Sequence, residues 1–465
     1  MGIAYDPVRD HLVMFGSQYL SDERTWFYDF RSNTWQAREL NPHPPGQKLG
    51  TYSTIPKMTY DSVNDVILCV VWLDNRGHET WALDPEKLKW NKLNPAVEPP
   101  PSKSRSRNLS FSASHNVFIL ELSTTNNRPE LWTYRYRKAQ RSPRPAPPTN
   151  LEVVADNNKA KLQWNASTTS DVTEYRIYRA EPDQPWRAEF KNIATVSSSK
   201  FEDQNVTFGK TYTYVIKSAR RDGSESQPSV RARTQPRVLG APVVSVLATN
   251  RIEVRWNPHP VSDVTGYNLY RGLVAVKTVK KGEPGAWKDN DPEYAAPMVV
   301  KVADIRQIKK LNDKPLHATS YNDQVDLTQR LLNTGDYKFT VFAYIVRTEN
   351  KLGVESGPSP YALTIPSEPL NVVCREKGDI AELKWDANPE NAIAGYRVYK
   401  LKGTWEILQV TKDPIRSVTF THQGGREPTR YWIVAVDALG QEGQPSSPAW
   451  CNHSYQGYFK TEWHQ

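Results

Sequence analysis

The residues that could carry chemistry in this chain are few, and their spacing fits no familiar reaction machinery. Nine histidines and three cysteines are scattered through 465 residues. None of them forms a His-Glu-x-x-His zinc site or a Cys-x-x-Cys pair, and the chain has no Gly-x-Ser-x-Gly nucleophile turn and no glycine-rich phosphate loop. The sequence therefore predicts a protein that is not an enzyme, with no catalytic, metal-binding or cofactor-binding residues.

Two other places in the sequence could have a chemical function. Cys69 lies in the apolar run from Val66 to Leu73, where a thiol is usually a plain core residue. The oxygen-rich stretch Asp289-Asn-Asp291-Pro-Glu293 could bind calcium, but the rest of a calcium loop is missing. In both places the structural reading is preferred to the functional one.

The strands that would position any functional site are expected from sequence repeats. In residues 1–140 a Tyr-Asp pair and two tryptophans recur after 55 residues: Tyr5-Asp6, Trp26 and Trp35, then Tyr60-Asp61, Trp81 and Trp90. A worn third copy follows at an offset of 51, with Phe111 and Trp132 at the matching positions. Repeats of roughly 40 to 55 residues built from short apolar strands are typical of β-propeller blades.

A propeller needs about four to eight blades, and this part of the chain supplies about three. We therefore expect the chain to open part-way through a larger propeller. Its missing blades would belong to the same full-length chain, and blades from another chain are the alternative.

The second half has a repeat of its own, Trp-x10-Tyr-x2-Tyr. Its three copies start at Trp164, Trp256 and Trp385. Around each tryptophan, apolar residues alternate with polar ones, as in a strand with one buried face. A later strand repeats the alternation as Tyr212-x-Tyr214-x-Ile216, Tyr337-x-Phe339-x-Val341 and Tyr431-x-Ile433-x-Ala435. This density of short strands predicts three two-sheet sandwiches.

These motifs resemble two known families. Residues 146–453 resemble three tandem fibronectin type III domains, and Thr25-Trp26-x-Tyr28-Asp29 with Asn33-x-Trp35 resembles the kelch-type blades of galactose-oxidase-like propellers. The resemblance implies an all-β chain, a partial β-propeller followed by three immunoglobulin-like β-sandwiches. The expected boundaries are a propeller part at 1–140, a proline-rich linker at 141–148, sandwiches at 149–235, 237–366 and 367–453, and a tail at 454–465.

The middle sandwich is longer than the others. Tyr270 to Tyr337 spans 67 residues, whereas Tyr178 to Tyr212 spans 34. The surplus is expected at about 271–320, as an elaborated edge hairpin or, alternatively, a specialised binding surface. The residues that would form that surface are Lys277, Lys280, Lys281, Trp287, Lys288, Lys309 and Lys310.

The fibronectin-type resemblance also bears on two cysteines. It implies that Cys374, at the end of the first strand of the third sandwich, and Cys451, after its last strand, approach each other closely enough for a disulfide. Such a bond persists in an oxidising compartment, which favours an extracellular or cell-surface location. Two unrelated buried thiols are the alternative.

Composition narrows the function further. The net charge of +9 is spread along the chain, with no base-stacking motif beside its basic clusters, so no nucleic-acid partner is expected. The longest apolar run has eight residues, too few for a membrane span. We favour a modular binding, adhesion or scaffold protein whose sandwiches form a semi-rigid stalk for a protein or polysaccharide ligand. The alternatives are an accessory C-terminal region of a secreted carbohydrate-active enzyme or oxidase and, less favoured, an intracellular kelch adaptor.

Overall fold

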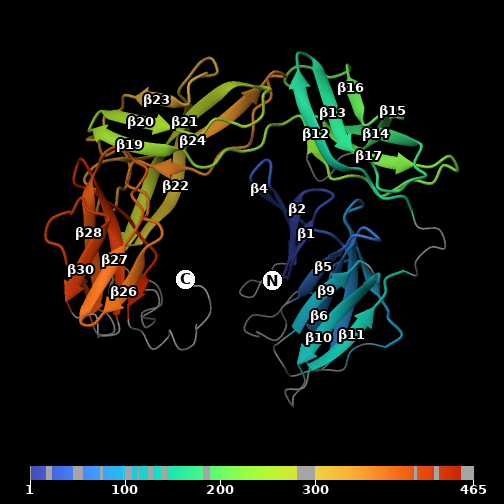
Figure 1. The fold of residues 1–465 in the computed structure, drawn as a ribbon, viewed down its shortest axis with the longest axis horizontal. Coiled ribbons are helices and arrows are strands. Elements are labelled where there is room, and N and C mark those ends of the chain that lie inside the picture. Colours follow the sequence, from blue (N-terminus) through green and yellow to red (C-terminus); the bar gives the residue numbers. More distant parts are fainter. Residues whose placement is uncertain are drawn as a thin grey trace. The chain divides into compact units, whose positions relative to one another are not determined.

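The computed structural model describes residues 2–16, 23–45, 56–73, 77–97, 99, 107–113, 115–123, 129–137, 144–181, 189–279, 299–402, 406–423 and 429–451. Over these residues the chain is all-β, as Figure 1 shows. No helix in this part of the chain is long and apolar enough to cross a membrane. The chain divides into two compact units. Unit 1 comprises Met1–Val238, Val261–Val264 and Glu349–Gly357, and unit 2 comprises the remainder.

Three antiparallel sheets open unit 1. The first sheet has the strand order β1 (Gly2–Asp6), β2 (His11–Phe15), β3 (Thr25–Asp29), β4 (Thr34–Arg38). The second repeats this order as β5 (Lys57–Asp61), β6 (Val66–Leu73), β7 (Gly77–Asp84), β8 (Lys89–Leu93). The third has three described strands, β9 (Arg107–Ser112), β10 (Val117–Ser123) and β11 (Pro129–Tyr134). The repeat in the sequence is therefore a repeat of simple antiparallel meanders.

Aspartate side chains stabilise the turn between the first and second strands of the repeat. Asp6 accepts the backbone N–H groups of Val8 and Arg9, and Asp61 does the same for the second and third residues after it. The last residue of this turn adopts a positive φ in all three sheets, with φ 55° at Asp10, 53° at Asp65 and 49° at Asn116. Asp and Asn tolerate this conformation best among residues other than glycine.

The three sheets pack face to face. One apolar cluster joins the first sheet to the second through Phe15, Phe27, Cys69 and Trp90, and another joins the second to the third through Leu68 and Phe118. The sheets thus share cores, as blades do. However, the described strands form no closed ring, so propeller closure goes beyond what the structure shows.

Each sandwich consists of two antiparallel sheets. In the first, β12 (Thr149–Asp156), β13 (Lys159–Asn165) and β16 (Lys200–Asp203) face a sheet of β15 (Lys191–Val196), β14 (Glu174–Ala180), β17 (Thr213–Ala219) and β18 (Ala232–Arg233). The second repeats this with β19 (Val243–Ala248), β20 (Arg251–Arg255) and β23 (Ser320–Asp323), opposite β22 (Val299–Lys310), β21 (Val264–Val279), β24 (Val341–Asn350) and β25 (Ala362–Leu363).

The third sandwich follows the same plan. Its smaller sheet is β26 (Val373–Lys377), β27 (Ile380–Lys384), β30 (Thr419–Gln423), and its larger sheet is β29 (Glu406–Gln409), β28 (Ile393–Lys402), β31 (Thr429–Asp437), β32 (Glu442–Pro445). The short β33 (Ala449–Cys451) also pairs with β31.

The Trp-x10-Tyr spacing corresponds to one recurring contact. The ring centroids of Trp164 and Tyr175 lie 5.6 Å apart with the rings 70° to each other. The matching pairs of the second and third sandwiches lie 5.6 Å and 5.4 Å apart in the same edge-to-face arrangement. In each sandwich the tyrosine hydroxyl accepts the backbone N–H of a residue eight positions earlier. The Trp-x10-Tyr spacing therefore places the same Trp–Tyr contact in the core of each of the three sandwiches.

One expected strand in the second sandwich is wrong. Tyr337 and Phe339 lie before β24, outside any strand. The true counterpart of Tyr214 is Tyr344, because the hydroxyls of both donate to the aspartate that ends the preceding strand, Asp203 and Asp323 respectively. The sequence pattern misled because the residues before β24 also alternate.

The additional residues of the second sandwich therefore fall in two separate places. Between the paired-tyrosine strand and the aspartate the distances are 53 residues (270 to 323) and 25 residues (178 to 203), a surplus of 28. From the aspartate to the next tyrosine they are 21 residues (323 to 344) and 11 residues (203 to 214), a surplus of ten. The first surplus extends β21 and β22 into a long antiparallel pair, and the second lengthens the loop before β24.

The two extensions cover each other. Val274 and Val276 of β21 are fully or almost fully buried and pack with Tyr337 of the lengthened loop, and the N–H of Val276 donates to the carbonyl of Asn333 at 2.8 Å. The hairpin therefore has a small core of its own. This is the elaborated hairpin that the sequence offers as one reading of the insertion.

Candidate functional site

The lysine surface lies mostly outside the described residues. Lys280, Lys281, Trp287 and Lys288 fall there, as does the calcium candidate at Asp289 to Glu293. Lys277 lies on β21, opposite Lys301 of β22. Lys309 and Lys310 lie on β22 opposite Arg271 and Tyr270, and both side chains are exposed. The structure thus puts three of these lysines on one hairpin, and binding by this surface stays a prediction.

The cysteines lie where the fibronectin-type resemblance implies. Cys374 of β26 and Cys451 of β33 are paired as a disulfide, with their Cα atoms 5.4 Å apart and 77 residues between them in sequence. That Cα separation is usual for the bond. Whether the cross-link forms in the protein stays a prediction. Cys69 is free and fully buried, and burial raises the pKa of its thiol, so the residue is an inert part of the core.

Sequence reasoning missed a buried, heavily charged region among the described residues of unit 1. It lies where the turns of the first two sheets meet the last strand of the first sandwich. Arg9 is only 2% exposed, and its guanidinium contacts Asp6, Asp65 and Glu86 at 2.9, 2.7 and 3.1 Å. Nearby, the backbone N–H of Arg231 donates to the carbonyl of Val8 at 2.8 Å.

The same region contains a second cluster around Asp29. Arg233 of β18 reaches this carboxylate at 2.6 Å, and Nε2 of His11 lies 3.6 Å from it. Arg31 donates to the backbone carbonyls of Arg233 and Gln235 at 3.1 and 2.7 Å. The contacts between Arg233 and Asp29, and those that Arg31 makes, join residues about 200 positions apart. We call the two clusters together the arginine network, comprising Asp6, Arg9, His11, Asp29, Arg31, Asp65, Glu86, Arg231 and Arg233.

Burial and neighbouring charges shift the pKa values of the network. Burial and the nearby arginine charges lower the pKa of Arg31 and of Arg231 to about 10. For Asp29, burial alone would raise the pKa, but neighbouring His11 and the charge of Arg233 hold it below its usual range. Burial lowers the pKa of His11. Arg31, Arg231 and Asp29 are therefore charged at neutral pH, and His11 is neutral.

An open cleft of about 740 Å³ adjoins the arginine network. Its wall combines charged side chains with two rings, Tyr178 and Phe190; the other lining residues are Val8, Arg9, Asp65, Glu86, Glu189, Val215, Lys217, Gln227, Pro228 and Arg231. Arg231 stacks over Phe190 at 5.0 Å. The volume falls within the range of small-ligand sites, about 300–1,000 Å³. Its charges are largely engaged with one another, so the arrangement suits binding or joining better than acid–base catalysis.

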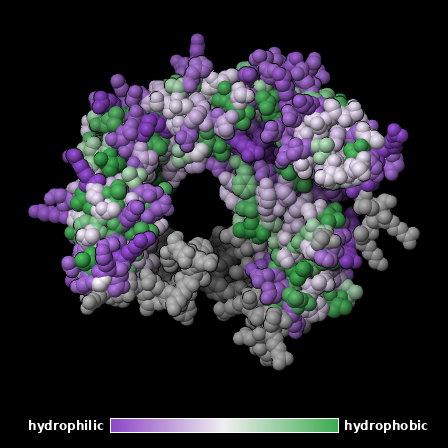
Figure 2. Space-filling model, viewed as in Figure 1, coloured by the Kyte–Doolittle hydropathy of each residue, from purple (hydrophilic) through white to green (hydrophobic). Residues whose placement is uncertain are grey.

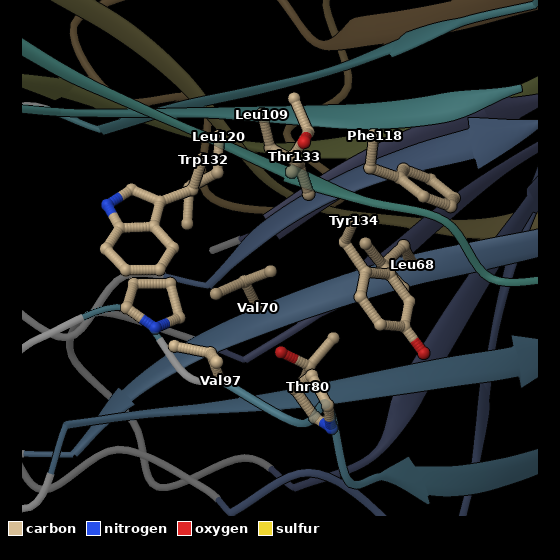
Figure 3. A pocket seen from close by; sticks show the side chains of 12 residues that line it. Leu68, Val70, Thr80, Val97, Leu109, Phe118, Leu120, Trp132, Thr133 and Tyr134 are labelled. Atoms are coloured by element: carbon tan, nitrogen blue, oxygen red, sulfur yellow. The ribbon is translucent and has the colours of Figure 1, made fainter. Parts of the chain in front are cut away.

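A second cavity, between the second and third sheets, is too small for a ligand. Figure 3 shows Trp132 and Tyr134 converging with Val70 and Leu68, the apolar side chains that also join these sheets. Its volume is about 40 Å³, well below that of a ligand site. Among the described residues, no group of three His, Cys, Asp or Glu could hold a metal ion.

The strand order and the threefold Trp–Tyr contact decide the type of sandwich. The three sandwiches are fibronectin type III-like. No family model matches the chain. Among solved structures, an Fn3-like protein from Clostridium thermocellum is 32% identical and covers 19% of this chain and 90% of its own, with a TM-score of 0.17. The chicken CNTN1 FN1–FN3 domains are 14% identical and cover 66% of this chain and 98% of their own, with a TM-score of 0.18.

Two curated relatives are enzymes. An amylopullulanase of Thermoanaerobacterium saccharolyticum is 33% identical over 93 residues, and one of Thermoanaerobacterium thermosulfurigenes is 36% identical over 93 residues. Each match spans 20% of this chain but only 7% and 5% of the respective enzyme. The chain thus matches a small part of each of these relatives.

Proposed function

We propose that this chain is a non-catalytic accessory region of a secreted carbohydrate-active enzyme of the amylopullulanase kind. The observation that carries the proposal is the 93-residue match to two amylopullulanases. That length is close to one sandwich, since residues 149–235 number 87. A module of this size on a much longer enzyme is an accessory part, and its substrate would be an α-glucan.

The described polar groups favour a structural role over a catalytic one. The most buried carboxylates of the arginine network, Asp6 and Asp29, are each 1% exposed and engaged by arginines. The pKa of Asp29 lies below its usual range, so this carboxylate cannot serve as a general acid near neutral pH. In this proposal the three sandwiches are the semi-rigid connecting element, and the three N-terminal sheets are blades of a propeller.

The adhesion reading finds less support. It depends on a ligand surface, and its best candidate is the lysine hairpin, whose tip lies outside the described residues. The proposed location is extracellular, because the Cys374–Cys451 disulfide would persist outside the cell.

Probing the secreted and cellular fractions of the native source with an antibody against this chain tests the proposal. We expect the antibody-reactive band in the medium to be larger than the 53.1 kDa of this chain and to coincide with a zone of pullulan or amylose hydrolysis in an activity gel. The recombinant chain should give no such zone. A reactive cell-surface band without hydrolysis would favour adhesion, and a cytoplasmic band would favour the adaptor.

A further inference from the structure

The first sheet has one buried and one uncovered face. Ala4, Val13, Phe15 and Phe27 are buried against the second sheet. On the opposite face, Ile3 and Tyr5 are each 47% exposed, and Trp35 is 45% exposed. No described sheet covers this face. In Figure 2, green hydrophobic atoms reach the surface over the first sheet, near the N-terminus marked in Figure 1.

The 55-residue repeat relates the residues of this uncovered face to residues of the second sheet that lie in an inter-sheet core. Adding 55 to Ile3, Leu12, Met14 and Trp35 gives Met58, Ile67, Cys69 and Trp90. These four residues are between 0% and 7% exposed and lie in the core shared with the first sheet. At these four positions, the face of the second sheet that docks on the first therefore recurs on the uncovered side of the first sheet.

The contact made by Trp90 defines the chemistry that Trp35 requires. Trp90 donates its indole N–H to Oγ1 of Thr25 at 2.8 Å, and its ring lies 5.6 Å from the ring of Phe15. Thr25 and Phe15 both belong to the first sheet. By the same geometry, Trp35 requires a neighbouring sheet that offers a threonine hydroxyl beside an apolar side chain. The second sheet itself keeps this pattern, because Thr80 and Val70 are the repeat counterparts of Thr25 and Phe15.

The far face of the third sheet is different. There Glu121 replaces the buried Val70 of the second sheet, and Thr133 replaces the buried Ala82, at the offset of 51. Asn108 donates to Glu121 at 3.2 Å on this face. Among its described residues, Leu131 is the large apolar side chain that is exposed, and Ile119 is half-buried. A polar outer face is what the last member of a stack needs. The unfinished end of the stack is therefore the first sheet.

We infer that the face of Ile3, Tyr5, Leu12, Met14, Tyr28 and Trp35 is an inter-sheet interface, and that its occupant is a further four-stranded sheet of the same repeat from the same polypeptide, ahead of residue 2. A second copy of this chain fits poorly. Its third sheet offers a polar face, and its first sheet offers the same bulky rings rather than a threonine beside apolar groups. This inference is independent of the amylopullulanase proposal.

A chain extended by one repeat tests the occupant. The extension is a copy of residues 46–100 followed by a copy of residues 46–55, joined to Met1, which restores the 55-residue spacing. Hydroxyl-radical labelling with mass spectrometry reports the exposure of Trp35, and buried Trp385 is the internal reference. We expect the extension to slow labelling of Trp35 at least fivefold and to leave Trp385 unchanged.

A matched control carries Leu68→Asp and Val70→Asp in the copy only, and it should leave Trp35 labelled as in the 465-residue chain. Equal labelling of Trp35 with and without the extension overturns the inference. Protection of Trp35 that rises with the concentration of the unextended chain also overturns it, in favour of a second copy. In the 465-residue chain, Ile3→Asp with Trp35→Ser should lower hydrophobic-dye fluorescence without lowering Tm, and a lowered Tm would show that the face is already covered.

Discussion

A single edge-to-face ring pair is the residue-scale unit of this fold. Each Trp–Tyr pair is anchored by a tyrosine hydroxyl that accepts a backbone N–H, whereas the indole N–H groups of Trp164, Trp256 and Trp385 have no hydrogen-bond partner. The tryptophans therefore contribute apolar area and shape rather than polar bonds. Because ring area and spacing are visible in the sequence, this part of the core could be predicted from the sequence alone.

Truncating one of these rings should be costly. We expect Trp385→Ala to lower the free energy of unfolding of the third sandwich by about 3–5 kcal/mol, the usual cost of removing a buried tryptophan. Trp385→Phe should cost distinctly less, because it keeps most of the ring and removes a buried donor that lacks an acceptor. Denaturant unfolding followed by hydrogen exchange in β27 and β28 measures both. Equal losses for the two variants would contradict this account.

His11 should make the first sheet sensitive to acid. Burial lowers its pKa from the ordinary value of 6.5, so below pH 6.5 the unfolded state binds a proton that the folded state does not. Stability then falls as pH falls from about 7 to 5, by up to about 1.4 kcal/mol per pH unit. Asp29 does not contribute in this window, because its folded pKa is lowered from 3.8 and its stabilisation is lost only under stronger acid.

Replacing the histidine should flatten that slope. In His11→Gln, the opening free energy of β1–β4, from hydrogen exchange at pH 5 and pH 7, should differ less between the two pH values than in the parent chain. The exposed His317→Gln serves as the control and should keep the parental slope. A parental slope in His11→Gln would mean that His11 does not titrate as its burial implies.

At the scale of elements, the sequence predicted strands well and long-range partners poorly. Alternation and ring spacing are local, so they located the strands of the sandwiches. The strand containing Tyr344 was misplaced because an insertion of ten residues put Tyr337 and Phe339 into the same pattern. The arginine network was missed because Arg233 and Asp29 are 204 residues apart, and nothing local marks either as a partner of the other.

The Cys374–Cys451 disulfide ties the first strand of the third sandwich to its last. Closing a loop of 77 residues should stabilise this sandwich by on the order of 2–5 kcal/mol. Intact-mass analysis under denaturing conditions, with alkylation before and after reduction, decides whether the bond forms. We expect one alkylated thiol, that of Cys69, before reduction and three afterwards. Three alkylated thiols before reduction would contradict the bond and weaken the case for an extracellular location.

At the scale of the whole molecule, the stiffness of unit 2 depends on how its sandwiches are joined. Asn391 of the third sandwich donates its backbone N–H to Oγ of Ser245 at 2.9 Å and its amide to Glu253 at 2.6 Å. Arg255 donates to the carbonyl of Pro389 at 2.8 Å, and the N–H of Gln444 donates to the carbonyl of Pro366 at 3.2 Å. A joint with this many direct bonds suits a semi-rigid stalk better than independently moving beads.

Hydrogen exchange at this joint measures that stiffness directly, because the N–H of Asn391 is protected only while its bond to Ser245 holds. We expect Arg255→Ala to speed exchange of that amide severalfold, since it removes the bonds to Pro389 and to the Asn391 side chain. Arg251→Ala, on the same strand but exposed, is the matched control and should leave the rate unchanged. Because these joint residues are partly exposed, neither variant should cost more than about 1 kcal/mol of stability. A fast-exchanging Asn391 amide in the parent chain would instead show that the two sandwiches move freely, and the stalk would then act as a flexible tether.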